Sequence, residues 1–111
     1  MTLARWLDAR APAPPAALRD RIDAALGDDL TRESTDVFEA CLAAAERLVR
    51  TLLGENATSR DSALDLLAAD ALVTYAFEAS SEHPAGLARR ASAAMTRIAA
   101  LGRDETRSVQ A

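Results

Sequence analysis

The residues that break helices stand at the edges of long, alanine-rich segments of this chain. All four prolines and three of the four glycines fall where a helix would start or stop. Of the 111 residues, 27 are alanine, the best helix former, whereas isoleucine and valine, which favour strands, number only two and four. The sequence therefore predicts an all-α fold, a small antiparallel helical bundle of about four core helices with a short N-terminal helical arm.

Caps and helical periodicity divide the chain into four parts. We expect a short N-terminal amphipathic helix at 1–10, a proline-rich linker at 11–15, a helical bundle domain at 16–102 and a flexible polar tail at 103–111. Within the bundle domain, Asp36, which is followed by Glu39, and Thr58 or Ser59 are expected to begin two of the helices. The expected helices end at Gly27, at Gly54, near residue 81 and at Gly102. The short connections between the last three helices predict that they are antiparallel neighbours.

Charge and cysteine content narrow the range of partners and compartments. The formal net charge is −4, all 13 basic residues are arginine, and the longest basic run is Arg89-Arg90. Binding to nucleic acid or to an anionic membrane needs clustered cations, so neither is an expected partner. The single cysteine, Cys41, and the charged first ten residues, which lack an apolar secretion segment, favour a cytoplasmic location. No apolar stretch reaches the roughly 18 residues that a membrane span requires.

The most apolar run is LDLLAADALVTYAFEA, Leu64 to Ala79, and it nevertheless contains Asp65 and Asp70. A helical projection at about 100° per residue resolves this run into two apolar stripes. The broad first stripe consists of Leu64, Leu67, Ala68, Ala71, Leu72, Tyr75 and Ala79. The narrower second stripe consists of Leu66, Val73 and Phe77. A helix with two apolar stripes must bury both, so we expect the first to face the protein's own core.

Three interpretations of the second stripe are open. The helix is the core of a monomer, or the stripe is a self-association face, or it lines a ligand cleft. The flanks of the stripe are a polar edge of Asp70, Thr74 and Glu78 on one side and the small residues Ala69, Ala76 and Ser80 on the other. Small residues permit the close approach of another helix. We expect Asp70 to be partly buried, with Arg47, Arg50 or Arg97 as its partner.

Trp6 is the only tryptophan, and it stands on a short amphipathic segment tethered by the proline-rich linker. Such a segment can fold back onto the bundle and cover the second stripe, which is the interpretation we favour. The alternative is that Trp6 docks into a partner, because tryptophan is enriched at the energetic centres of protein interfaces.

No motif in the sequence predicts catalysis, a metal site or a bound cofactor. The carboxylates of Asp70 and Glu78 are about two helical turns apart, and a helical carboxylate site normally adds histidines from other helices. The only histidine, His83, stands at a helix junction, where it is expected to be a junction residue or a cap. Cys41 is most simply interpreted as a buried small hydrophobic residue.

The segment LAADALVTYAFEASSE, Leu67 to Glu82, resembles the helix that follows the first aspartate-rich motif of trans-polyprenyl diphosphate synthases. The resemblance covers about 16 of the 111 residues. Those enzymes hold magnesium and a diphosphate with two DDxxD motifs, whereas the only adjacent aspartates here, Asp28-Asp29, are followed by Leu-Thr-Arg. The resemblance therefore implies an alanine-rich packed helix and no diphosphate chemistry.

Together these observations predict a non-enzymatic helical protein that associates with itself, as a dimer, or binds another protein through helix 60–81. The alternative is a small-molecule-binding bundle whose apolar cleft is lined by the same helix. No cofactor is expected. The residues expected at the interface are Trp6, Leu66, Ala69, Asp70, Val73, Thr74, Phe77 and Glu78.

Overall fold

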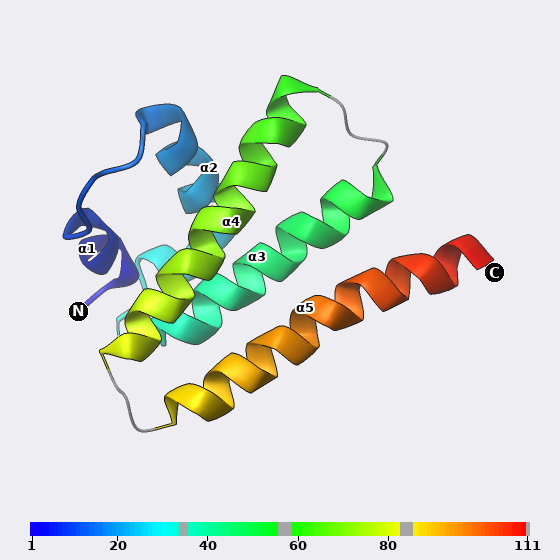
Figure 1. Cartoon of the computed structure of the whole chain (residues 1–111). Helices are drawn as coiled ribbons and strands as arrows, with labels where there is room; N and C mark the ends of the chain where they lie inside the picture. The colour runs from blue at the N-terminus through cyan, green and yellow to red at the C-terminus, as the bar shows by residue number, and fades with distance from the viewer. Residues whose placement is uncertain (34–35, 56–58, 83–85, 111) are drawn as a thin grey trace.

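The computed structural model describes residues 1–33, 36–55, 59–82 and 86–110, with the backbone alone for 104–110 (Figure 1). The helices in these ranges are α1 (Leu3–Asp8), α2 (Ala16–Leu26), α3 (Val37–Gly54), α4 (Arg60–Ser81) and α5 (Leu87–Gln110), with a short 3₁₀ helix, η1 (Gly27–Leu30), after α2. The described part of the chain contains no strand, so the predicted all-α class is confirmed. Nor does it contain a helix that combines the length and the apolar character needed to span a membrane.

Local chemistry explains where the helices begin and end. The Asp36 carboxylate accepts a hydrogen bond from the Glu39 backbone N–H at 3.1 Å, and the Ser59 hydroxyl accepts one from the Ser62 N–H at 3.1 Å. These bonds satisfy N–H groups that have no partner inside the helix. At the end of α2, Gly27 has a φ of +57°, a conformation that glycine adopts without the steric cost of a side chain. The boundaries expected at these three residues are confirmed.

The central unit is an antiparallel hairpin of α3 and α4, with α1 and α2 on one side and α5 on the other (Figure 1). Three large side chains at its core, Ile22, Leu42 and Leu72, are at most 1% exposed. Ala44 and Ala76 are also fully buried in this core. Small side chains allow helix axes to approach closely, so these buried alanines suit helix contacts.

Arginine side chains fasten α2 to the helices beside it. Arg19 binds Asp8 of α1 at 2.9 Å, and Arg21 binds Asp61 and Asp65 of α4 at 2.9 and 3.0 Å. Asp65, one of the two aspartates inside the apolar run, is therefore an ion-pair partner for α2. These pairs orient the helices, although partly exposed ion pairs contribute only about 0–1 kcal/mol each to stability.

The buried face of α4 differs from the predicted first stripe. Leu67 is 55% exposed, although Leu72 in the same stripe is fully buried. Buried instead are the small residues Ala69, Ala76 and Ser80, none more than 3% exposed. The expectation that the whole first stripe faces the core was therefore wrong for Leu67. The buried face of α4 includes Ala68, Leu72, Ala76 and Ala79, and at about 100° per residue Leu67 lies well outside that face.

The last helix also departs from expectation, because α5 continues through Gly102 to Gln110. Glycine ends a helix mainly when it adopts a positive φ, and the described glycines with positive φ are Gly27 and Gly86. A glycine inside a helix costs only about 1 kcal/mol relative to alanine. The helix end predicted at Gly102 was therefore wrong, and the flexibility of 103–111 stays a prediction.

Candidate functional site

An open apolar groove of about 300 Å³ lies between α3, α4 and α5, and we call it the α3–α5 groove. Its described lining comprises Leu42, Ala45, Glu46, Val49 and Leu53 of α3, Leu66, Ala69, Asp70 and Val73 of α4, and Ile98, Leu101 and Gly102 of α5. Four residues expected at the interface are thus brought together at this groove. They are Leu66, Ala69, Asp70 and Val73.

Several large apolar side chains at the groove are exposed to solvent. Leu66 is 60% exposed, Leu53 is 40% exposed and Ile98 is 38% exposed. Val73 is half-buried and packs against the core. Exposed leucines and isoleucines that occur singly are ordinary, but here they line one concave surface contributed by three helices. The chain therefore leaves part of the predicted second stripe uncovered.

An ion-pair cluster joins α3 to α5 beside the groove, and one member of the cluster, Glu46, lines the groove. Arg97 of α5 donates to Glu46 and, at 3.0 Å, to Glu39, both on α3. The hydrogen bond to Glu39, followed by weaker contributions that include Glu46, raises the pKa of Arg97 above its usual value. The Glu46 side chain is 14% exposed, so it lies largely out of water with its charge compensated. Glu46 also faces Arg50 on its own helix, but at 4.0 Å this is the longer contact.

Asp70 lies at the edge of the groove and is exposed rather than partly buried. Two of the partners expected for it have other contacts: Arg97 binds Glu39 and Glu46, and Arg47 donates to the Ala25 carbonyl at 2.8 Å. The partial burial predicted for Asp70 was therefore wrong. The reason is its place on α4: at about 100° per residue, Asp70 lies nearly opposite the buried residues Ala68, Leu72, Ala76 and Ala79.

The remaining residues of the predicted interface on α4 lie away from the groove lining. Thr74 and Glu78 are exposed; the Thr74 hydroxyl donates to the Asp70 carbonyl, and Glu78 is 4.0 Å from Arg10. Phe77 is half-buried and packs against the core. The polar edge is thus a solvent-facing line on α4.

Trp6 is buried against its own bundle, at 7% exposed. Its ring meets Tyr75 edge-on with centroids 6.0 Å apart, and its indole N–H donates to Glu82 at 3.5 Å. The Arg10 guanidinium lies 4.0 Å from the centre of the indole ring and binds Glu82 at 3.2 Å. The arm therefore folds back, as we favoured, but it packs against Tyr75 of the first stripe. Leu66 of the second stripe lines the α3–α5 groove, which lies on a different side of α4. The arm therefore does not cover Leu66.

The structure places Cys41 and the acidic side chains, two kinds of group in the sequence that can carry chemistry. Burial raises the pKa of the Cys41 thiol to about 12, so the nucleophilic thiolate is scarce near neutral pH. Across residues 1–33, 36–55, 59–82 and 86–103, no three histidine, cysteine, aspartate or glutamate side chains come together as metal ligands. His83 lies outside the described residues.

The groove residues on α3 and α5 were missed by the sequence analysis. Leu53 and Ile98 belong to the apolar stripes of their own helices, and that pattern alone predicts burial in the core. The signal that they share a surface with Leu66 is the tertiary arrangement of three helices, which helical periodicity does not contain.

Comparisons with protein families, with functionally characterised proteins and with solved structures find no match for this chain.

Proposed function

We propose that this chain is a non-enzymatic helical protein that forms a dimer by burying the α3–α5 groove against a second copy. The observation that carries the proposal is the exposed Leu66, at 60%, beside a concave apolar surface. Burial of apolar surface stabilises association by about 25 cal/mol per Å² removed from water. In a two-fold dimer the same patch meets itself, so a patch with both a protruding leucine and a groove can be self-complementary.

The choice of a second copy follows from what the groove offers. Its described lining is mostly aliphatic, the Glu46 charge is neutralised by Arg97, and Asp70 stands at the exposed edge. An apolar centre with polar groups at its rim is the usual anatomy of a protein interface. A second copy carries the same aliphatic surface and is always present at the concentration of the chain itself.

Leu66 and its neighbour Leu67 provide a matched test. Both are on α4, and they are 60% and 55% exposed, but only Leu66 is among the described residues that line the groove. We expect Leu66→Glu to weaken self-association by at least about thirtyfold, because it places an unpaired carboxylate in an apolar contact. Leu67→Glu should leave it unchanged. Size-exclusion chromatography with light scattering measures both masses, and equal behaviour of the two variants would contradict the proposal.

A second candidate function uses the same groove as a site for a small apolar ligand. Its volume of about 300 Å³ favours this possibility, because ligand pockets start at roughly that size. A chain that stays monomeric and gains thermal stability with an apolar ligand would support this candidate over the dimer.

For the compartment we propose the cytoplasm. Support comes from the single cysteine, which is buried in the core as a free thiol. Cell fractionation with an antibody to the chain tests this part of the proposal.

A further inference from the structure

Two of the three helices that line the α3–α5 groove carry charges of opposite sign. The sequence of α4 contains four acidic residues and one arginine. The sequence of α5 contains five arginines and two acidic residues. A surface that includes both helices is therefore negative on one half and positive on the other, provided that these charges are not already compensated within the chain.

Most of the charges on the two helices are compensated in this way. Both aspartates that precede Asp70 on α4 bind Arg21 of α2, at 2.9 and 3.0 Å. On α5, Arg97 is bound to two carboxylates of α3, and Arg90 also has an interaction within the chain. These groups hold the bundle together and are not open to a partner.

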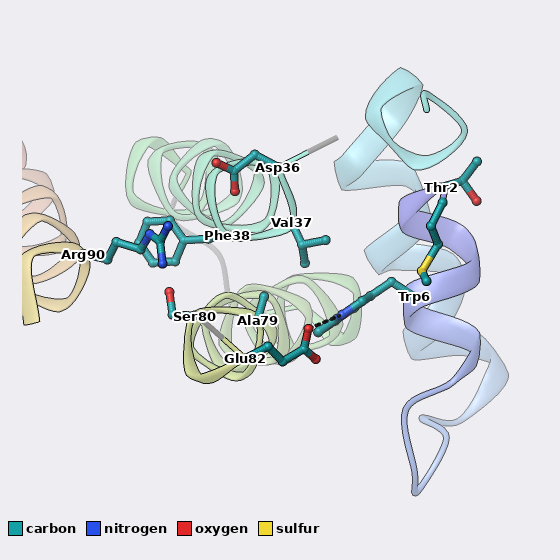
Figure 2. Close-up of a pocket in the computed structure, with 10 residues that line it drawn as sticks. Thr2, Trp6, Asp36, Val37, Phe38, Ala79, Ser80, Glu82 and Arg90 are labelled. Carbon is teal, nitrogen blue, oxygen red and sulfur yellow. Dashed lines mark hydrogen bonds between the residues drawn. The ribbon is translucent and has the colours of Figure 1, made fainter. Parts of the chain in front are cut away.

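The charges at the α1 end of the bundle are engaged in the same way. A second pocket, of about 350 Å³, lies where α1 meets the first turn of α3 and the last turn of α4, and we call it the end pocket (Figure 2). One Glu82 oxygen accepts the Trp6 indole N–H at 3.5 Å, and the other accepts a hydrogen bond from Arg10 at 3.2 Å. Glu82 and Arg90, which both line the end pocket, thus already have partners in the chain.

The charges that remain near the groove are negative on α4 and positive on α5. Asp70, Arg89 and Arg103 are exposed, and none of the three has an ion-pair partner among the described residues. Asp70 lines the groove, and Arg103 directly follows Gly102, which also lines it. Arg89 stands 14 residues before Arg103, about four helical turns, so the two arginines lie on the same side of α5. Arg60, also exposed, is the first residue of α4 and does not belong to the described lining.

Exposed apolar side chains occur on both helices as well. Leu66 of α4 is 60% exposed, and Met95 and Ile98 of α5 are 63% and 38% exposed. A partner that removes these side chains from water has to cover α4 and α5 together. Its own surface has to be basic where it meets Asp70 and acidic where it meets the arginines of α5.

We propose that the two-fold axis of the dimer runs between α4 and α5, along the helices, so that α4 of each copy lies on α5 of the other. This inference rests on the proposed dimer and specifies its geometry. A rotation of 180° about such an axis exchanges the two helices, so Asp70 of each copy meets the basic α5 of the partner subunit. The same rotation places Leu66 over the apolar side chains of that helix. An axis across the helices would instead set α4 against α4, with like charges opposite each other.

Reversal of one charge on each helix tests the geometry. In a homodimer of Asp70→Arg, or of Arg103→Asp, like charges face each other at both of the equivalent contacts. We expect each variant to self-associate about tenfold more weakly than the wild-type chain at low ionic strength. In an equal mixture of the two variants, opposite charges face each other at both contacts. The mixture should therefore form heterodimers about as tightly as the wild-type chain forms its dimer, as measured by sedimentation equilibrium.

Two control variants make the same changes of net charge on other helices. Asp20→Arg in α2 and Arg5→Asp in α1 alter exposed residues outside the described groove lining and should leave association unchanged. Circular dichroism confirms that all four variants are folded. Wild-type association of Arg103→Asp, an equal loss in the controls, or a mixture that does not recover would overturn the arrangement of α4 on α5 while the dimer itself stands. A wild-type chain that is monomeric at every concentration would contradict the proposed function, and the geometry with it.

Discussion

The two sides of α4 are covered very differently. On the side of α1, Trp6 is buried against Tyr75, and Arg10 and Glu82 close over the indole ring. On the side of the α3–α5 groove, Leu66 is 60% exposed. The same helix thus has one apolar surface that the chain covers with its own arm and another that it leaves in water. Of the two surfaces, the exposed one has the larger apolar area left to remove from water.

Removal of Trp6 tests the covered side and should have the largest effect on stability. Trp6→Ala deletes a buried aromatic side chain, and we expect it to lower the free energy of unfolding by about 3–5 kcal/mol. Urea denaturation followed by circular dichroism measures the change without relying on tryptophan fluorescence. A loss below about 1 kcal/mol would show that the arm is not part of the cooperative core, and the contrast between the two sides would disappear.

Two alanine-to-leucine substitutions on α4 compare the packed core, at Ala76, with the α3–α5 groove, at Ala69. Ala76 is fully buried in the core, whereas Ala69 lines the α3–α5 groove, where space is available. We expect Ala76→Leu to destabilise the fold by about 1–3 kcal/mol, because the larger side chain forces α3 and α4 apart. Ala69→Leu should cost clearly less. If both substitutions lower the thermal midpoint equally, the groove does not have the room that the structure assigns to it.

Ser80 is 1% exposed, and its hydroxyl has no hydrogen-bond partner among the described residues. Ser80→Ala should therefore stabilise the chain by about 1 kcal/mol, since it removes an unpaired buried hydroxyl and introduces a better helix former. The exposed neighbouring variant Ser81→Ala serves as the control, with a change within about 0.5 kcal/mol. Both free energies come from urea denaturation. Destabilisation by Ser80→Ala would mean that the hydroxyl is already satisfied in the free protein.

Cys41 has no effect on the pH dependence of stability near neutral pH, and its effect appears only at alkaline pH. Burial raises the pKa of the folded thiol from 9.0 to about 12, so the folded state holds its proton more tightly than the unfolded state. The resulting stability is present below about pH 9 and is lost as the pH rises toward 12. A Cys41→Ala variant should show a shallower loss over this range. Rapid labelling of the native thiol by a disulfide reagent at pH 8 would contradict the burial of Cys41.

The sequence was sufficient for the fold class, for the caps at Asp36 and Ser59 and for the end of α2 at Gly27. The prediction failed on the face of α4 because a hydrophobic stripe ranks leucine above alanine, whereas the structure buries Ala69, Ala76 and Ser80 and leaves Leu67 exposed. It failed at Gly102 because sequence alone does not reveal the sign of φ. Both pockets depend on how distant helices meet, so their outlines could not be derived from periodicity within single helices.

The most direct test of the central claim is the mass of the wild-type chain in solution by sedimentation equilibrium over a dilution series. The chain has a mass of 11.8 kDa. The proposed burial of the α3–α5 groove predicts a particle of two chains that dissociates reversibly to single chains on dilution. A mass of 11.8 kDa at every concentration would contradict self-association through the groove.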